Sequence, residues 1–264
     1  MKKIIFTISL GLAVVTVKAQ LKQGRVLYTR TVQMMMDIAT EEGASAPLPR
    51  AHTSKLEVLF GNDQSLCRAV EEDRPEEEEV EGGMRVHVMV AGADDLTYVN
   101  LTTGQVVEQR EFGAKNYIVA DSIRKLNWKL TGQTATILNY PCQQAVAQLI
   151  GKRSRMSMEN GEMKTKEVAD TSEIVAWFTP AIPVSAGPEY PGQLPGLILG
   201  IEVGNGRTIY KAVEISGDVE LAAIKPPSKG KKVTAEEFDR ERDKIFAEMQ
   251  RSNGGRATRI DIVH

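Results

Sequence analysis

Cysteine and histidine are scarce in this chain, and each shortage excludes a class of site. The 264 residues include only two cysteines and three histidines. Two cysteines are too few for a disulfide-rich scaffold or for a zinc site made of four thiolates. No histidine has a zinc-type partner three or four residues away; the three are His52, His87 and His264. We therefore expect neither a metal site nor a cofactor.

Long apolar runs are also rare, and the one that stands out lies at the N-terminus. Residues 4–17 form an apolar run after two lysines, and Val17-Lys18-Ala19 places small or aliphatic residues at the positions that a signal peptidase reads, which is the pattern of a secretory signal peptide. The run is shorter than the roughly 20 residues that span a membrane. We predict that residues 1–19 are a signal peptide, cut before Gln20, and that no transmembrane segment remains. The mature chain is expected to be periplasmic or secreted.

Positive charge is not in excess. The net charge of the whole chain is -2, and removal of Lys2, Lys3 and Lys18 with the signal peptide changes it to -5. A mildly acidic protein is poorly suited to nonspecific binding of nucleic acid or of an anionic membrane. We expect no nucleic-acid partner.

Recognisable catalytic motifs are missing as well. No G-x-S-x-G sequence occurs. The S-x-x-K pattern occurs at Ser122 and Ser228, but in a strand-like run and a linker rather than at the start of a helix. We therefore expect a noncatalytic protein. A hydrolase or thiol enzyme using Cys142 remains an alternative, because a base distant in sequence could approach the thiol in space.

Alternation of apolar and polar residues is what the chain has in abundance. This period of two predicts half-buried strands, and it is clearest in residues 24–37, 55–60 and 84–90. Glycine-containing turns typical of hairpins separate such runs, at residues 61–63, 103–104, 160–161 and 204–206. We predict an all-β domain over residues 20–230, mainly antiparallel, that forms a curved sheet or half-open barrel. The Pro/Ala-rich residues 41–50 are expected to form a loop.

The C-terminal residues 231–264 change period and predict an amphipathic helix with a tail. Thr234 and Glu237 have the spacing of a capping box. Apolar residues then recur on one helical stripe, and Asn253-Gly254 gives a stop signal. The helix is expected from about Ala235 to Arg251.

Three local features leave alternatives open. Cys67 and Cys142 could form a disulfide in an exported protein, or could be two small buried residues. The acidic residues 71–83 are best explained as a solvated loop, with a calcium site as the alternative. Methionine clusters suit Cu(I) chemically, although methionine also fills irregular cores; the clusters contain Met34, Met35, Met36, Met156, Met158 and Met163.

One segment resembles a known family. Gln193-Leu194-Pro195-Gly196-Leu197-Ile198 is similar to the signature of the GLPGLI family of exported bacterial envelope proteins, with Gln193 in place of the first glycine. Trp128, Lys129, Tyr140, Cys142 and Ala145 extend the similarity in the same order as the family pattern. The resemblance implies an envelope protein of undefined biochemical role.

Closely spaced prolines and glycines precede the apolar residues 197–203. They predict successive turns that fix the entry of a strand buried on both faces. Alternatively, these rigid loops form the rim of a ligand site, lined by Trp177, Phe178, Tyr190, Leu194 and Pro195. We expect the protein to bind an apolar small molecule or an envelope protein partner.

Overall fold

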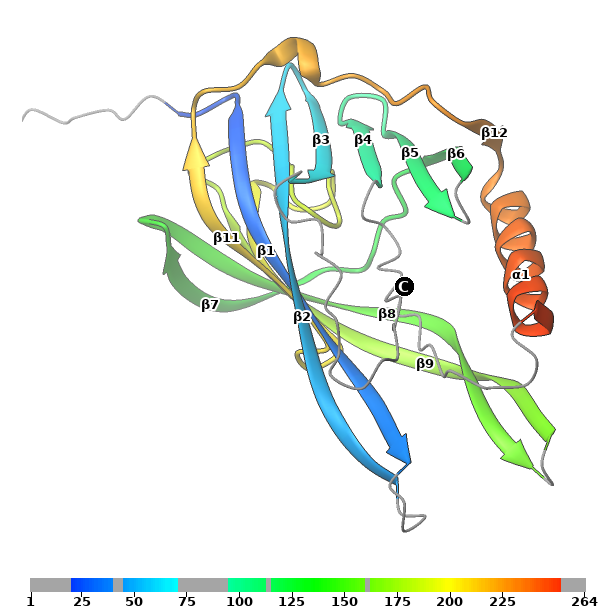
Figure 1. The fold of residues 1–264 in the computed structure, drawn as a ribbon. Helices are drawn as coiled ribbons and strands as arrows, with labels where there is room; N and C mark the ends of the chain where they lie inside the picture. The colour runs from blue at the N-terminus through cyan, green and yellow to red at the C-terminus, as the bar shows by residue number, and fades with distance from the viewer. Residues whose placement is uncertain (1–19, 40–44, 71–94, 113–114, 160–161, 253–264) are drawn as a thin grey trace, which may run out of the picture.

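A computed structural model describes residues 20–39, 45–70, 95–112, 115–159 and 162–252. They form one twelve-stranded sheet with the order β12-β6-β5-β4-β3-β2-β1-β11-β10-β9-β8-β7 (Figure 1). The strands are β1 (Gly24–Ala39), β2 (Ser45–Gly61), β3 (Gln64–Ala69), β4 (Leu96–Asn100), β5 (Gln105–Phe112), β6 (Lys115–Ser122), β7 (Lys129–Ile137), β8 (Tyr140–Glu159), β9 (Glu162–Thr179), β10 (Leu197–Val203), β11 (Thr208–Ser216) and β12 (Lys231–Val233). A 3-10 turn, η2 (Leu221–Ala223), and one helix, α1 (Ala235–Ser252), complete the described structure.

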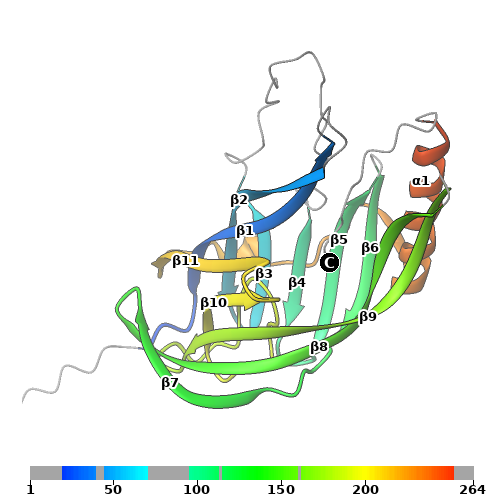
Figure 2. The ribbon, with the colours of Figure 1, turned by 90° about the horizontal axis from the view of Figure 1, so that it is seen from below.

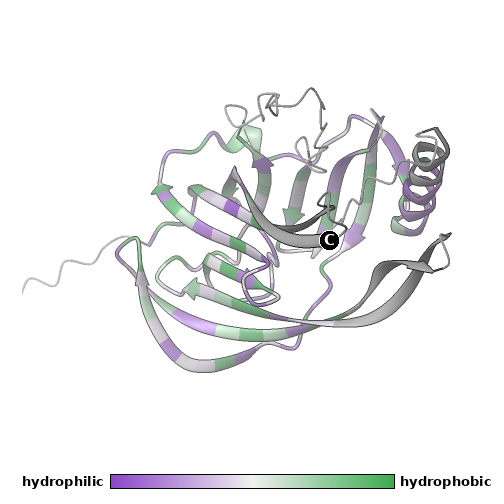
Figure 3. Ribbon diagram, turned by 60° about the horizontal axis from the view of Figure 1, so that its bottom comes forward, coloured by the Kyte–Doolittle hydropathy of each residue, from purple (hydrophilic) through white to green (hydrophobic). Residues whose placement is uncertain are grey.

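The predicted all-β, mainly antiparallel fold is confirmed. All strand pairs are antiparallel except β12 with β6. The sheet curves without closing, with β4–β6 on one side, β7–β9 on the other and α1 beside the opening (Figure 2). Burial alternates along β11 from Thr208 to Val213, because successive side chains of a strand point to opposite faces. Hydrophilic and hydrophobic residues are interspersed along the strands (Figure 3).

Glycine turns connect several neighbouring strands, as the sequence predicts. Asn62 and Asp63 between β2 and β3 both have positive φ, as does Gly104 between β4 and β5. Positive φ also occurs between β10 and β11, at Gly204, Asn205 and Gly206. These conformations match the twist of the paired strands, which favours tight hairpins.

One expected loop is a strand instead. Residues 45–50 continue β2 and pair with β1 up to Ala39↔Ser45, despite Pro47 and Pro49. β3 pairs with β2 only from Leu56 onward. Within the described strands, the first part of β2 therefore has an open edge, where a proline without an N–H is tolerated.

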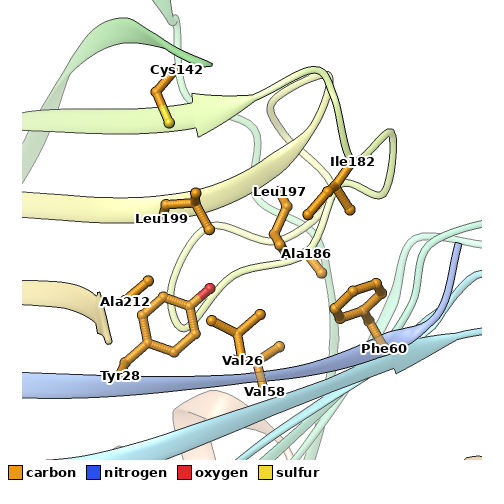
Figure 4. Close-up of a cluster of buried hydrophobic side chains, with 10 residues drawn as sticks. All are labelled: Val26, Tyr28, Val58, Phe60, Cys142, Ile182, Ala186, Leu197, Leu199 and Ala212. Atoms are coloured by element: carbon orange, nitrogen blue, oxygen red, sulfur yellow. The ribbon is translucent and has the colours of Figure 1, made fainter. Parts of the chain in front are cut away.

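The main core lies where β1 and β2 meet the residues that connect β9 to β10. Figure 4 shows Tyr28 and Phe60 facing Leu197, Ile182 and Ala186. The full cluster contains Val26, Tyr28, Val58, Phe60, Cys142, Ile182, Ala186, Leu197, Leu199 and Ala212. The connecting segment 180–196 is thus part of the core, which explains its concentration of backbone constraints.

Two glycines show why that segment needs its particular sequence. A Cβ at Gly196 would collide with the carbonyl oxygen of Thr179. Gly192 has φ +75°, and a Cβ there would collide with Ile123. Gly196 thus approaches the Thr179 backbone at a distance that only glycine allows, whereas at Gly192 the positive φ is the stronger reason for glycine.

Helix α1 begins with the predicted capping box. The amide of Thr234 donates to Glu237 Oε2 at 2.9 Å, and the amide of Glu237 donates to Thr234 Oγ1 at 3.1 Å. Phe238 then packs edge-on against Tyr117 of β6, with ring centroids 5.4 Å apart. The helix is fixed at the β6 edge of the sheet. No helix in the described segments is long and apolar enough to cross a membrane.

Several predictions concern residues outside those the structure describes. They are the signal peptide at residues 1–19, with its cut after Ala19, the acidic residues 71–83, the strand at residues 84–90, the turn at residues 160–161 and the helix stop at Asn253-Gly254. These stay predictions.

Candidate functional site

The five residues predicted to line a ligand rim do not lie together on one surface. Phe178 and Leu194 are core side chains, with 0% and 3% of their surface exposed. Trp177 precedes Phe178 in β9, and its half-buried side chain packs against the main core cluster. The two side chains diverge because neighbouring residues of a strand face opposite ways. Pro195 is exposed. Phe178 and Leu194 belong to a second core cluster, and of the other three residues only Tyr190 packs against it. The second cluster contains Ala145, Ile174, Ala176, Phe178, Leu194, Ile198, Ile201 and Tyr210.

Gln193 holds the segment around Tyr190 in place. Its Oε1 accepts hydrogen bonds from Trp128 Nε1 at 3.1 Å and from the amide of Leu126 at 2.9 Å. Trp128 contacts the Tyr190 ring edge-on, with centroids 5.7 Å apart. Gln193 thus ties the connecting segment to the residues before β7.

Both cysteines are free thiols in the structure, so the disulfide considered from the sequence is not formed. Cys67 is on β3 and Cys142 on β8, with β2, β1, β11, β10 and β9 between them in the sheet. Each packs against the main core cluster. Burial raises the pKa of Cys67 to about 12 and also raises the pKa of Cys142. Thiols with a raised pKa have little thiolate character, which suits structural cysteines better than nucleophiles.

Metal ligands do not gather in the part of the chain that the structure describes. There, no three side chains of His, Cys, Asp or Glu could hold an ion together. His52 is on β2, opposite Val32 of β1. The backbone places Met34 and Met36 on β1, and Met156 and Met158 on β8. The side chains of these methionines lie outside the description, so the copper hypothesis stays untested.

A polar group that sequence reasoning missed lies on the concave side of the sheet. In β1, Val26 and Tyr28 face the core, and Arg30 continues this alternating series. Arg30 is paired in register with Tyr210 of β11, and its Cζ lies 5.8 Å from the centre of the Tyr210 ring. The Tyr210 hydroxyl donates a hydrogen bond to Glu189 Oε1 at 2.9 Å. We call Arg30, Glu189 and Tyr210 the concave cluster.

Tyr210 separates the two charges of this cluster. Its ring contacts Arg30 and its hydroxyl contacts Glu189, and no ion pair joins the two charged residues within the described structure. The Nε–H of Arg30 is shielded from solvent and has no hydrogen-bond partner among the described residues. Within the described part of the chain, this N–H of the guanidinium is therefore unsatisfied.

Glu189 has the environment of a residue on a concave surface. Its side chain is exposed, yet desolvation raises the pKa of its carboxyl group. Solvent access and desolvation coexist when protein surrounds a group on several sides but does not cover it. The hydrogen bond from Tyr210 and the charge of Arg30 act in the opposite direction and lower that pKa. Desolvation followed by the Glu189 charge raises the pKa of Tyr210 well above its ordinary value.

Further charged groups surround the concave cluster. Cys67 and Asp95 are within electrostatic range of Arg30. Arg110 and Glu108 of β5 also act on Glu189, but they form an ion pair of their own at 2.7 Å. Desolvation raises the pKa of Asp95. Arg30 thus differs from Arg110 in having no carboxylate partner in the described segments.

Two hollows at the surface lie away from this cluster. One of about 390 Å³ lies between β12 and α1, and the other of about 240 Å³ lies on the β7–β8 hairpin. The first is lined by Lys231, Lys232, Val233, Glu237, Arg240, Glu241 and Lys244. Neither contains a residue predicted to bind a ligand.

Comparison with known proteins gives a match of part of the chain to a family of unknown function. Residues 128–200 match the family described as "Protein of unknown function (Porph_ging)". The match includes β7, β8, β9 and the connecting segment, where the sequence resemblance is strongest. No curated protein matches the chain.

Two solved structures share the fold. They are PNGF-II in the P21 and C2 space groups, each with a TM-score of 0.51 and 15% sequence identity. The matches cover 84% of this chain, but only 34% and 33% of the PNGF-II chains. The chain thus spans about a third of the length of PNGF-II, and the similarity concerns the fold alone.

Proposed function

We propose that this is an exported, noncatalytic envelope protein of the GLPGLI type that binds a ligand or a protein partner on the concave side of its sheet. The observation that carries the proposal is the concave cluster. Half-buried Arg30 and exposed Glu189 meet there around Tyr210, and Arg30 has no carboxylate partner among the described residues. Partly desolvated polar groups that remain open to solvent are typical of binding surfaces.

The noncatalytic part of the proposal is supported by the chemistry of the thiols. Cys142 is buried, has a raised pKa and lies 3.4 Å from the carbonyl oxygen of Tyr140, to which it donates. A nucleophilic cysteine needs a lowered pKa or an adjacent base. Neither condition is met among the described neighbours of Cys142.

The test is the mass of the protein isolated from its own cell envelope without denaturation. We expect a noncovalent addition, either a small molecule or a stoichiometric protein, that is lost on denaturation. We also expect the denatured chain to begin at Gln20. A chain recovered from the envelope with no added mass and no co-purifying protein would contradict the proposed function.

A further inference from the structure

Arg30 is a cation held by the sheet without an ion-pair partner among the residues that the structure describes. Glu189 is the carboxylate that contacts the same tyrosine, but its Oε1 accepts a hydrogen bond from the Tyr210 hydroxyl. The Arg30 Nε–H, shielded from solvent, lacks an acceptor in the described structure. A shielded donor without an acceptor costs free energy, more so when it carries charge. The shielded Nε–H stays beyond the reach of an external anion, but an anion at the accessible side of half-buried Arg30 would compensate its charge through a charge-assisted hydrogen bond.

The Tyr210 ring beside Arg30 is part of an apolar cluster. Tyr210 belongs to the second core cluster with Ile198 and Ile201. Leu56 and Tyr190 are half-buried at the border of the same cluster. A molecule whose charged group met Arg30 would therefore find apolar side chains beside it.

The number of acids near Arg30 limits the charge of a bound anion. Glu189 and Asp95 both lie within electrostatic range of Arg30, and desolvation disfavours the ionised form of each. Cys67, also near, is held as a neutral thiol by burial. Glu108 is paired with Arg110. A single negative charge fits this environment better than the double charge of a phosphate monoester, and a carboxylate matches the planar guanidinium fork.

We propose that the concave cluster binds an amphiphile with one carboxylate head, which pairs with Arg30 while its apolar body lies against Leu56 and Tyr190. The inference rests on the proposed function and names the chemical class of the ligand.

The test uses probes that differ only in the head group. Dodecanoate, dodecanol and dodecyl phosphate are titrated calorimetrically into the exported full chain after removal of any bound ligand. The affinity for dodecanoate should be at least about tenfold higher than for dodecanol, because a charge-assisted hydrogen bond contributes free energy equivalent to at least that ratio of affinities. Dodecyl phosphate should bind more weakly than dodecanoate.

Variants test whether the difference in affinity between dodecanoate and dodecanol depends on the concave cluster. Arg30→Met should bind dodecanoate no better than dodecanol. Arg25→Met is the matched control, since Arg25 is on the same strand but forms an ion pair with Glu57 at 2.6 Å; it should keep the difference. Glu189→Gln should bind dodecanoate more tightly than the parent chain, because a like charge is removed.

Each contrary result has a distinct meaning. Equal binding of dodecanoate and dodecanol, tighter binding of dodecyl phosphate, or an unchanged difference in Arg30→Met would overturn the carboxylate assignment. If Arg30→Met does not fold, Glu189→Gln is the deciding variant. The inference is then rejected if Glu189→Gln binds dodecanoate no more tightly than the parent chain. A bound molecule with a neutral head in the native mass would reject this inference alone. Absence of both ligand and partner in that experiment would reject the proposed function itself.

Discussion

Tyr28 has a buried hydroxyl group with a single structural task. It donates a 2.6 Å hydrogen bond to the carbonyl oxygen of Ile198, at the irregularity in the pairing of β10 with β9. Tyr28→Phe should lower the free energy of unfolding by about 1–3 kcal/mol, because the buried carbonyl loses its partner. Urea denaturation measures this. Tyr98→Phe is the control, since Tyr98 is also buried without a described hydroxyl partner; an equal loss there would contradict the explanation.

Glu189 should make stability depend on pH with a definite sign. Its pKa is raised above 4.5, chiefly by desolvation, so the folded state binds the proton more tightly than the unfolded state. Its contribution is full below the unfolded pKa and is lost as pH rises through the folded pKa. Glu189→Gln removes this loss. Its free energy of unfolding should therefore increase relative to the parent chain as pH rises from about 4 to about 8.

A carboxyl group with the opposite shift provides the control. The backbone amide of Ser122, and then Arg124, lower the pKa of Asp121. Its contribution is present above the unfolded pKa and is lost as pH falls through the folded pKa. Asp121→Asn should thus lose stability relative to the parent chain as pH rises. Parallel pH curves for Glu189→Gln and the parent would disprove the assigned environment of Glu189.

At the scale of elements, the segment between β9 and β10 depends on close backbone approach. A Cβ at Gly196 would collide with the carbonyl oxygen of Thr179. Gly196→Ala should cost about 1–3 kcal/mol, because the segment must shift within a packed core. Gly151→Ala on β8 is the matched control, since a Cβ there meets open space, and should change stability by less than about 0.5 kcal/mol. Denaturation midpoints compare the two; equal losses would refute the packing argument.

The start of α1 depends on its cap. Thr234→Ala removes the hydroxyl that accepts from the amide of Glu237, and should cost about 1 kcal/mol of local stability. The amide of Glu237 should then exchange its hydrogen faster, as measured by hydrogen exchange. Thr234→Ser keeps an acceptor and should restore protection; unchanged exchange in Thr234→Ala would show that the cap is unimportant.

On the scale of the whole molecule, a continuous sheet predicts one cooperative unfolding transition. The two tryptophans, Trp128 just before β7 and Trp177 on β9, lie far from Cys67 on β3 in the strand order. Tryptophan fluorescence and the reactivity of the Cys67 thiol, in a Cys142→Ala chain, should change at the same denaturant concentration. Two separate midpoints would show that the sheet consists of independently folding parts.

Local signals explain which predictions succeeded. The strands around Val26 and Val58, the turn at Gly104 and the cap at Thr234 depend on residues close in sequence, whose preferences act locally. The extension of β2 through Pro47 was missed because proline is compatible with an open strand edge, and strand order is not a local property. Arg30 is recognisable in the sequence because it interrupts an apolar alternation, whereas no sequence signal indicates Glu189.

The sequence by itself determined the alternating strands, their glycine turns and the capped C-terminal helix, because side-chain period and backbone preference act over a few residues. Only the tertiary structure decided that Phe178 and Leu194 are core, that two cysteines remain apart, and that Arg30 meets Glu189 across Tyr210. These outcomes depend on the curvature of the sheet and on the path of the segment inside it. Both result from packing between residues far apart in the chain, which no local pattern specifies.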